Sequence, residues 1–302
     1  MSRPGLIPTF TTAVNTWQCD ENDHLNVQFY TEFGHEASAH LMTLLGLGPR
    51  AAAAAGIAAR PFSDHIRYLR EFRVVEPIEV HSAPVEVGER HLVAYHEVRN
   101  AADGAVAATI CRRIDGGRPW PAAFRARAEA ACIALPAAAR PRSVGVPVLP
   151  DVTLAQAAAI GLILVGRTVI KPQECDDHGV LLPRHQFGRY SDAAPMLWNH
   201  MGFDRSAMQD RQEGSVVVET LHYYRTPARA GDLIVIMSGL AGFTDKTLKL
   251  VHYAFDGESG ALVACSKGVG MKFDQKIRKI VAFAADDRAR LARCKLELFA
   301  QE

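Results

Sequence analysis

The stretch CDENDHLNVQFYTEFGHEA, Cys19 to Ala37, places a dense polar run directly before a helical apolar pattern. Its second to sixth residues are Asp, Glu, Asn, Asp and His, and every one of these can hydrogen-bond or exchange a proton. From Tyr30 onward, apolar residues recur at steps of three and four, as on one face of an amphipathic helix. The stretch therefore predicts a polar turn at the mouth of a long, half-buried helix.

The predicted helix runs from Val27 to Leu45, and Gly46 is a typical residue just beyond a helix C-terminus. A second helix with the same apolar spacing is predicted from Pro183 to Met201, followed by Gly202. The expected buried stripes are Tyr30, Phe33, Ala37, Leu41 and Leu44 in the first helix, and Phe187, Tyr190, Ala194, Leu197 and Met201 in the second.

The chain repeats itself at a shift of 156 residues. The matched positions, with a one-residue slip at the tyrosines, are Cys19-Asp20 with Cys175-Asp176, Gly46 with Gly202, His96 with His252, Gly104 with Gly260, and Tyr68 and Arg70 with Tyr223 and Arg225. Because the identities keep their order over a long span, we interpret the halves as two copies of one structural unit.

Each half continues with alternating or apolar segments typical of strands. The predicted strands are 10–18, 65–74, 78–89, 91–100 and 105–114 in the first half, and 164–173, 215–227, 232–243, 248–256 and 261–273 in the second. A charged, Ala-rich helix closes each half. The fold class is thus α+β, with two tandem domains at 1–135 and 161–302 and a Pro/Ala-rich linker at 136–160.

Bulk composition excludes several classes of protein. The 302 residues are 48% hydrophobic and carry a net charge of +1, so nothing favours disorder, nucleic acid or an anionic membrane. No apolar run reaches the ~18 residues of a membrane span, and the N-terminus lacks a signal-peptide core. The six cysteines form no CxxC pair or zinc spacing, which favours a reduced, cytoplasmic protein.

With the polar turn, the long helix and the strands in place, the sequence resembles the hotdog fold, specifically the 4-hydroxybenzoyl-CoA thioesterase-like superfamily. Asp20, His24, Asn26 and Tyr30 match that family's signature, whereas Asp23 stands where the family usually has Gly. The segment YYRTPARAGDLIV, 223–235, is similar to a family strand motif. The resemblance covers both halves and implies a double hotdog.

The resemblance implies hydrolysis of acyl-CoA thioesters without a metal, with coenzyme A present only as part of the substrate. In that family the acyl-CoA lies between two hotdog units, and the Asp of one unit works opposite the helix N-terminus of the other. A double hotdog holds its partner unit within the chain, so we expect either a monomeric pseudo-dimer or a homo-oligomer.

Thioester hydrolysis requires an attacking oxygen and a stabilised oxyanion. Asp20 and Asp176 are the candidates for a general base or a nucleophile. Backbone N–H groups at each helix start can hold the oxyanion. His24 can bind the thioester carbonyl or orient water, and Asn26 can hold either group.

Each candidate also has a purely structural interpretation. Asp20 and Asn26 are common helix-capping residues, and Cys19 and Cys175 are small residues suited to a core. The tyrosines and arginines of the repeat can pair across strands or line a CoA groove. The candidate substrate-binding residues are Tyr30, Arg184, His185, Tyr68 and Tyr223.

The two halves differ at the turn, since Val180 and Leu182 replace His24 and Asn26. We therefore expect the main site in the first half, with catalysis on Asp176, aided by Glu174 or His185, as the alternative. Two other functions remain open: a hotdog enoyl-CoA hydratase or dehydratase, in which an Asp is followed five places later by His, and a non-catalytic acyl-CoA binding protein. The spacing from Asp20 to His24 is four.

Overall fold

The computed structural model describes residues 5–144 and 149–297. The chain divides into two compact units, residues 1–141 and 142–302, called unit 1 and unit 2 below. The division falls inside the range 136–160 that the sequence predicts as a linker.

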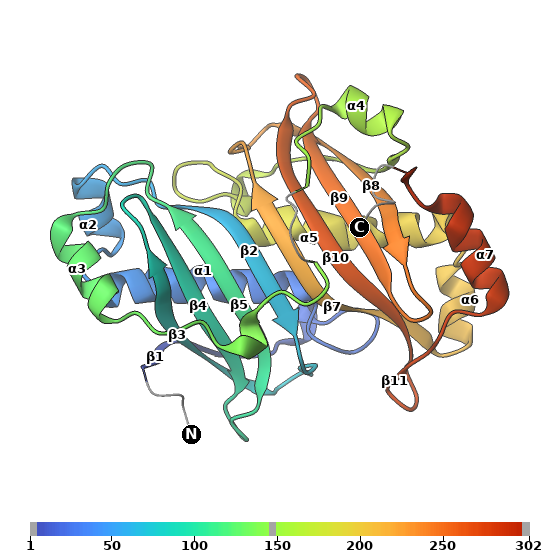
Figure 1. Cartoon of the computed structure of the whole chain (residues 1–302), viewed down its shortest axis with the longest axis horizontal. Coiled ribbons are helices and arrows are strands. Elements are labelled where there is room, and N and C mark those ends of the chain that lie inside the picture. Colours follow the sequence, from blue (N-terminus) through green and yellow to red (C-terminus); the bar gives the residue numbers. More distant parts are fainter. Residues whose placement is uncertain (1–4, 145–148, 298–302) are drawn as a thin grey trace. The chain divides into compact units, whose positions relative to one another are not determined.

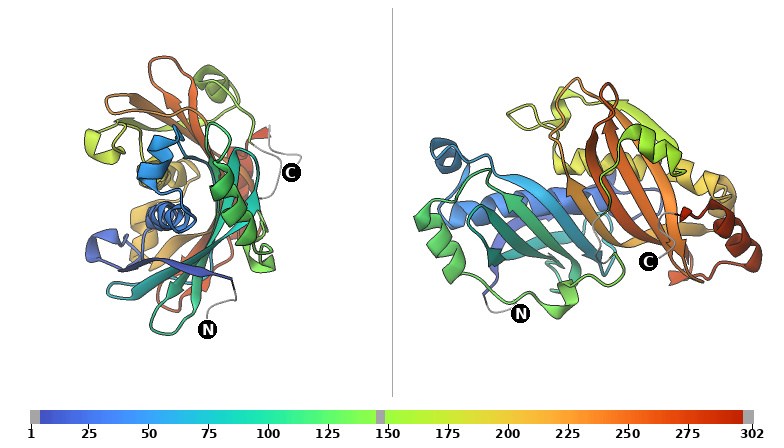
Figure 2. Two further views of the ribbon diagram at one scale, coloured as in Figure 1. Left: turned by 90° about the vertical axis from the view of Figure 1, so that its left-hand side faces the viewer. Right: turned by 45° about the horizontal axis from the view of Figure 1, so that its top comes forward.

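Unit 1 packs one long helix against a five-stranded antiparallel sheet. Its strands follow the spatial order β1-β3-β4-β5-β2, and helix α1 lies along one face of this sheet (Figures 1 and 2). The elements are β1 (Ile7–Ala13), η1 (Thr16–Gln18), α1 (Val27–Leu44), α2 (Pro49–Ala54), β2 (Arg60–Tyr68), β3 (Pro77–Val87), β4 (His91–Asn100), β5 (Val106–Asp115), α3 (Ala122–Ala130) and η2 (Ala137–Ala139).

Unit 2 repeats this arrangement with helix α5 and the strand order β7-β10-β9-β8-β6, and β11 pairs with β10. The elements are α4 (Leu154–Ala159), β6 (Ile163–Val169), η3 (Pro172–Glu174), α5 (Pro183–His200), α6 (Arg205–Asp210), β7 (Glu213–Tyr224), β8 (Leu233–Phe243), β9 (Leu248–Asp256), β10 (Leu262–Asp274), β11 (Lys279–Ile280) and α7 (Ala285–Cys294). The predicted α+β class with two tandem long-helix units is confirmed.

The apolar face of α1 forms the core of unit 1 together with the inner face of the sheet. Phe33, Ala37 and Leu41 are almost completely buried, and the first two share one cluster with sheet residues such as Ile110. The predicted stripe is wrong at Leu44, which is 58% exposed. A regular apolar spacing drifts slowly around the axis of an α-helix. At this end of α1, positions next to Leu44 therefore face the core in its place.

The outer face of the unit 2 sheet is also buried, because the chain before β6 folds over it. One cluster joins sheet residues Met237, Tyr253 and Cys265 to Leu149 and Ala157 of that covering segment. The Tyr253 hydroxyl donates to the Pro150 carbonyl at 3.4 Å. The range predicted as an aperiodic linker therefore contains helix α4 and supplies part of a hydrophobic core.

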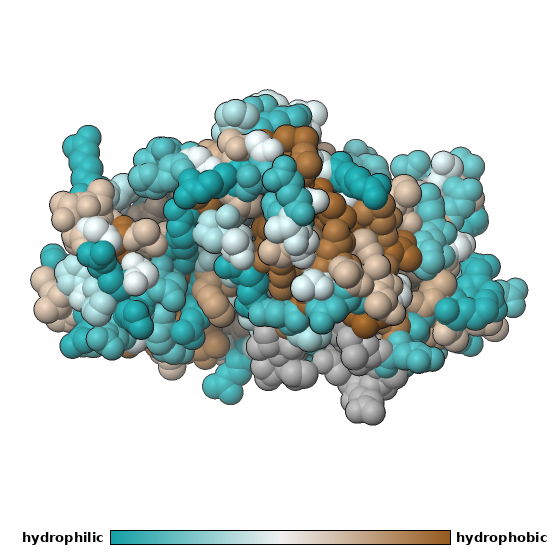
Figure 3. All heavy atoms as spheres, turned by 90° about the horizontal axis from the view of Figure 1, so that it is seen from above, coloured by the Kyte–Doolittle hydropathy of each residue, from teal (hydrophilic) through white to brown (hydrophobic). Residues whose placement is uncertain are grey.

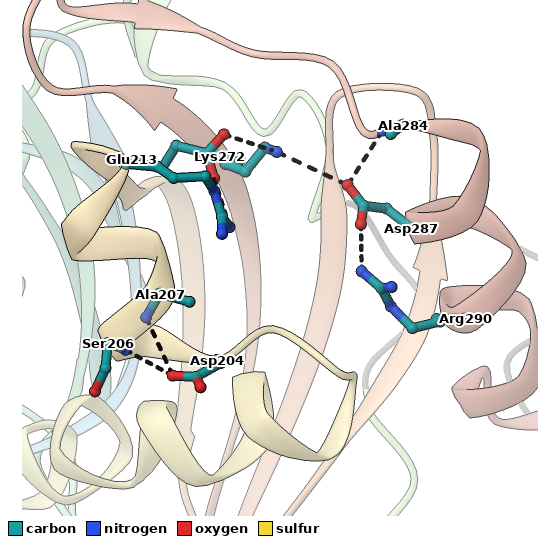
Figure 4. Close-up of polar contacts among 9 residues, drawn as sticks. Asp204, Ser206, Ala207, Glu213, Lys272, Ala284, Asp287 and Arg290 are labelled. Carbon is teal, nitrogen blue, oxygen red and sulfur yellow. Dashed lines mark hydrogen bonds and ion pairs between the residues drawn. The ribbon is translucent and has the colours of Figure 1, made fainter.

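Helix α7 is held against the end of the unit 2 sheet by a network of charges, shown in Figure 4. Lys272 of β10 lies 3.3 Å from a Glu213 oxygen on β7 and 3.8 Å from an Asp287 oxygen on α7. Asp287 also accepts from the Ala284 backbone and pairs with Arg290. These contacts join α7 to β7 and β10 and have a structural role.

The strand predictions are confirmed at β4 and β9, whose bounds match to the residue. They run three or more residues too far at four C-terminal ends, because the predicted strands 10–18, 65–74, 164–173 and 215–227 end at Ala13, Tyr68, Val169 and Tyr224. The predicted strand 65–74 ends at Tyr68, because the next two backbone N–H groups, those of Leu69 and Arg70, both turn to the Ala107 carbonyl. The predicted strand 10–18 ends at Ala13 and is followed by a short 3₁₀ turn.

The strand register shows that the repeat continues through the tyrosines without a slip. Both N–H groups that follow β7, those of Arg225 and Thr226, bond to Val263, the equivalent of Ala107 at a shift of 156. Tyr68 therefore corresponds to Tyr224, and the one-residue slip inferred from sequence is wrong. The adjacent Tyr223 and Tyr224 allow either alignment at the tyrosine, and Arg225 favours the slipped one, because it then matches Arg70.

Part of the unit 2 surface is apolar, and hydrophobic residues (brown) gather on one part of the face in Figure 3. Leu164, Val169 and Leu233 of this unit are 39–51% exposed. An open groove of about 650 Å³ lies among α4, β6 and β8, with Leu164 and Arg167 in its lining. Within residues 5–144 and 149–297, no helix is long and apolar enough to cross a membrane.

Candidate active site

The polar turn of unit 1 is a closed backbone loop that leads into α1. The Asp20 N–H donates to the His24 carbonyl at 3.0 Å, and the Asp23 N–H donates back to the Asp20 carbonyl at 3.1 Å. Asp23 adopts a left-handed φ of 59°, which explains why the family usually has Gly here. Gly179 takes the same conformation in unit 2, with a φ of 71°. The turn keeps its shape although Asp replaces Gly.

This loop brings the side chains of Asp20 and His24 together. The Asp20 Oδ1 lies 3.3 Å from the His24 Nδ1, and the two side chains are only 16% and 9% exposed. The Asn22 N–H donates to the same Oδ1 at 2.9 Å. Burial raises the pKa of Asp20, whereas the His24 imidazole and the backbone N–H groups of Asn22 and His24 act to lower it.

The other ring nitrogen of His24 has no partner. Nε2 is buried and accepts or donates no hydrogen bond within the described residues. Buried polar atoms in folded proteins are nearly always paired with protein, water or ligand. An imidazole held at one nitrogen by a carboxylate and bare at the other can bind water or a substrate carbonyl.

Asn26 is the N-cap of α1, since its side chain accepts from the Gln28 N–H at 3.1 Å. The Asn26 backbone carbonyl accepts a hydrogen bond from the Phe29 N–H, also at 3.1 Å. Of the first-turn donors, the Val27 N–H makes no hydrogen bond within the described residues. That group, at the positive end of the helix dipole, is available for an anion.

The corresponding turn of unit 2 has the same backbone but a different chemistry. Asp176 Oδ1 accepts from the N–H groups of His178 and Val180, both at 2.9 Å. Val180 and Leu182 occupy the places of His24 and Asn26, so the position of His24 carries no imidazole in unit 2 and α5 has no side-chain cap.

The alternative partner Glu174 is already engaged in structural contacts. Its Oε2 accepts from the Lys171 N–H at 2.7 Å and from Arg189 at 2.8 Å. Burial opposes ionisation of Glu174, but these contacts outweigh it and lower its pKa. A carboxylate held in this way is a poor proton acceptor. His185, the other alternative partner, lies partly exposed beside Arg184 in the first turn of α5.

The predicted substrate-binding tyrosines are distributed over different faces. Tyr30 is 3% exposed and packs edge-on against Tyr68, with ring centroids 5.1 Å apart. Tyr223 pairs in register with Cys265 and belongs to the cluster on the outer face of its sheet. Because that face points away from α5, Tyr223 lies apart from the polar turn of its own unit.

The cysteines and acidic residues give no sign of other chemistry. All six cysteines are free. Cys19 is partly buried and packs against the core of unit 1, and Cys175 is partly buried beside its turn. Burial raises the pKa of both thiols, which disfavours a thiolate nucleophile. Within the described ranges no three His, Cys, Asp or Glu side chains gather as a metal site would require.

Comparison with known families decides the assignment. The model of the thioesterase-like superfamily matches residues 14–126 and 170–291, one region in each unit. The chain belongs to the thioesterase-like superfamily. As a member of that family it consists of two hotdog units in tandem, as the resemblance implied.

Solved structures agree on the fold of this thioesterase-like chain. An acyl-ACP thioesterase from Bacteroides thetaiotaomicron is similar with a TM-score of 0.66 at 11% identity, over 88% of this chain and 98% of that one. The 12:0-ACP thioesterase from Umbellularia californica gives a TM-score of 0.66 at 11% identity, over 89% and 94%. A comparison with curated protein sequences gives no match.

Sequence reasoning missed a set of polar residues on the inner side of unit 2, namely Gln186, His222 and Ser266. They lie in segments that read as apolar helix or strand. A position-by-position comparison of the two halves could have found them, because their counterparts are Tyr30, Ile66 and Ile110.

Proposed function

We propose that this protein hydrolyses acyl-CoA thioesters to a free acid and coenzyme A, using the polar turn of unit 1. The observation that carries the proposal is the Asp20–His24 pair, in which a buried carboxylate lies 3.3 Å from one imidazole nitrogen and the other nitrogen has no partner in the described chain. Membership of the thioesterase-like superfamily supplies the reaction class.

In the proposed mechanism His24 is neutral and carries its proton on Nδ1, facing Asp20. Nε2 then presents a lone pair that accepts a hydrogen bond from the attacking water. Asp20 holds this tautomer and balances the positive charge that develops as the water loses its proton. In the alternative, Asp20 itself takes the proton or attacks the thioester carbon.

The oxyanion of the tetrahedral intermediate needs a donor that is present before the reaction. The Val27 N–H at the start of α1 is suited to this, because Asn26 already occupies the next two N–H groups. Collapse of the intermediate breaks the carbon–sulfur bond and releases the CoA thiolate.

The test is thiol release from acyl thioesters of graded length, comparing wild type with Asp20→Ala and Asp176→Ala. Each acyl group is offered on CoA and on acyl carrier protein, because two similar structures are described as ACP thioesterases. We expect turnover of the CoA esters, lost in Asp20→Ala and kept in Asp176→Ala. Turnover lost in Asp176→Ala and kept in Asp20→Ala would place the site in unit 2. Turnover of the ACP esters alone would show that the acyl carrier of the substrate is ACP and not CoA.

An enoyl-CoA hydratase is the less favoured function, since the spacing from Asp20 to His24 is four rather than five. Loss of enoyl absorbance without thiol release would support it. Binding of CoA esters without either reaction would instead support a non-catalytic binding protein.

A further inference from the structure

A pocket of unit 1 is lined mainly by cationic side chains. It is an open depression of about 460 Å³, and its lining includes Arg60, Arg90, His91, Arg113, Asp115 and Gly117. Three guanidinium groups and one carboxylate give the lining a net charge of +2 when the imidazole is neutral. The pocket therefore has the charge of an anion-binding site.

The pairing of three strands brings these side chains to one place. Arg60 on β2 and His91 on β4 are both direct partners of Asp115 on β5. Arg113 lies two residues before Asp115 on β5, so it shares the same face of the sheet. The cations converge because of the register, although they are far apart in the sequence.

The pocket lies on the face of the sheet that points away from α1. Leu92 and Ile114, each next in sequence to a lining residue, are buried in one cluster with residues at the C-terminal end of α1, so the lining side chains point the other way. The polar turn is at the other end of β2, where Tyr68 packs against Tyr30 in the first turn of α1. The strand places Arg60 about 26 Å from Tyr68. The pocket is therefore separate from the candidate active site.

The backbone around the pocket is held by hydrogen bonds. The Gly116 N–H donates to the Arg90 carbonyl at 2.8 Å, and the Trp120 N–H donates to the Glu89 carbonyl at 2.9 Å. These bonds tie the hairpin between β3 and β4 to the loop that follows β5. The Trp120 side chain is 4% exposed and anchors that loop in the core. The cationic side chains thus project from a fixed frame.

Two of the arginines have no carboxylate partner among the residues that the structure describes. Arg90 forms no side-chain hydrogen bond or ion pair there, and Arg113 lies over the Phe62 ring, 5.4 Å from its centroid. A guanidinium stacked on an aromatic ring keeps the N–H groups at its edge available for an anion. The nearby Asp115 accepts instead from the Gly117 N–H at 2.8 Å.

The other two cationic residues already have partners. His91 Nε2 lies 2.7 Å from a Glu86 oxygen, and Arg60 has an interaction of its own within unit 1 or beyond the pocket. Arg90 and Arg113 are therefore the groups best placed to contact a ligand directly.

The fold itself does not require these charges, as unit 2 shows. At the shift of 156 residues, apolar side chains replace three charged ones: Val216 for Arg60, Val269 for Arg113 and Met271 for Asp115. The strand pairing has the same irregularity at this point in both units, so the positions correspond. Since unit 2 forms the same strands without the charges, the cations of unit 1 point to a ligand rather than to folding.

We propose that this pocket binds a doubly charged phosphate group, with Arg90 and Arg113 as its main contacts. A phosphate dianion matches the net charge of the lining, and one guanidinium can bond two phosphate oxygens at once. Because the pocket is open, the phosphate can be a free ion or the end of a larger molecule that extends into solvent. The site goes beyond the proposed function, since its ligand does not have to be a thioester.

The experiment is isothermal titration calorimetry of wild type, Arg90→Gln and Arg113→Gln. The probes are inorganic phosphate, the phosphate ester glycerol 3-phosphate, and succinate as a dianion without phosphorus. Wild type is expected to bind a phosphate probe more tightly than succinate. Each variant is expected to bind that probe about tenfold or more weakly, as for loss of a charge-assisted hydrogen bond. Arg50→Gln removes an exposed charge of α2 outside the pocket and should keep the wild-type affinity.

The two phosphate probes distinguish the source of the group. Tighter binding of inorganic phosphate would support the proposal with the free ion as ligand, and tighter binding of glycerol 3-phosphate would support it with a phosphate ester.

The proposal would be overturned if neither phosphate probe bound at millimolar concentration, or if both pocket variants kept the wild-type affinity. An equal loss of affinity in Arg50→Gln would also overturn it, because it would reveal a general attraction of charge. Tighter binding of succinate would rule out phosphate as the recognised group. None of these results depends on thiol release, so failure of the thioesterase function would leave the pocket proposal standing.

Discussion

The Asp20 carboxylate and the His24 imidazole lie 3.3 Å apart across a turn whose backbone is closed by the hydrogen bond from the Asp20 N–H to the His24 carbonyl. The spacing of four residues is thus enforced by the main chain rather than by the side chains. Because both groups are largely buried, their interaction is screened less than that of an exposed pair. An ordinary helix cap requires a single side-chain acceptor, and Asn26 already supplies it.

The first prediction concerns His24→Gln. If Nε2 orients the attacking water, kcat for the best acyl-CoA should fall by about 10²-fold or more, within the range for loss of an acid–base group. Thiol release under saturating substrate is the measurement. Exposed His178 in the unit 2 turn provides the matched control, and His178→Gln should retain wild-type kcat.

A fall in kcat of less than about threefold in His24→Gln, together with a complete loss in Asp20→Asn, would contradict the role of His24. It would favour direct action of Asp20 as base or nucleophile.

The second prediction concerns the pH dependence of catalysis. Burial raises the pKa of Asp20, and His24 partly offsets this by favouring the ionised form. If ionised Asp20 is required, kcat/KM should decline on the acid side at a pH above the usual Asp value of about 3.9. Removal of His24 takes away a partner that lowers the pKa of Asp20, so the acid limb of His24→Gln should move to still higher pH. Profiles of kcat/KM from pH 4 to 9 for both proteins provide the measurement, and a shift to lower pH in the variant would refute this account.

The sequence was sufficient for the fold because the two helices and their glycine stops recur at one spacing. Gly46 and Gly202 both take a left-handed φ, 88° and 83°, directly after their helices. The polar turn could also be located, because its residues are contiguous. What could not be predicted was the face on which a strand residue lies, as Tyr223 shows.

A shift of one residue moves a strand side chain to the other face of its sheet. Because Tyr223 and Tyr224 are adjacent, the sequence did not reveal that shift. The burial of Gln186 could not be predicted for a related reason. A single polar residue on a helix is normally placed toward solvent, and only the packing of α5 reveals that it lies inside.

The third prediction concerns the buried ion pair of unit 1. Arg112 donates to both oxygens of Asp64 at 2.6 Å, and the two side chains are 1% and 0% exposed. Arg112→Met leaves a buried carboxylate without its cation and should lower the free energy of unfolding by about 3–5 kcal/mol. The double variant Arg112→Met with Asp64→Leu should recover much of that loss, as urea denaturation would reveal.

The exposed pair Arg125–Glu129, spaced by four residues on α3, is the control. Arg125→Met should cost less than about 0.5 kcal/mol. A double variant that is less stable than Arg112→Met alone would show that the pair contributes more than charge compensation.

The fourth prediction concerns stability in acid. His96 is completely buried between Ser38 and Ser82, and burial, with Arg112 nearby, lowers its pKa to about 3. The unfolded chain protonates this histidine near pH 6.5, whereas the folded protein does not do so until about pH 3. The unfolded state therefore binds the extra proton between these values, and stability falls as pH decreases through this window.

One such group makes the free energy of unfolding fall by about 1.4 kcal/mol for each pH unit below 6.5. His96→Gln removes the group that binds this proton in the unfolded state. The free energy of unfolding of the variant should therefore fall less steeply between pH 6.5 and 5, even if the variant is less stable at pH 7. Urea denaturation at several pH values in this window, with exposed His178→Gln as the control, measures both slopes. Equal slopes in wild type and His96→Gln would mean that His96 takes up its proton in the folded protein too, and that the Ser38–His96–Ser82 contacts tolerate an imidazolium.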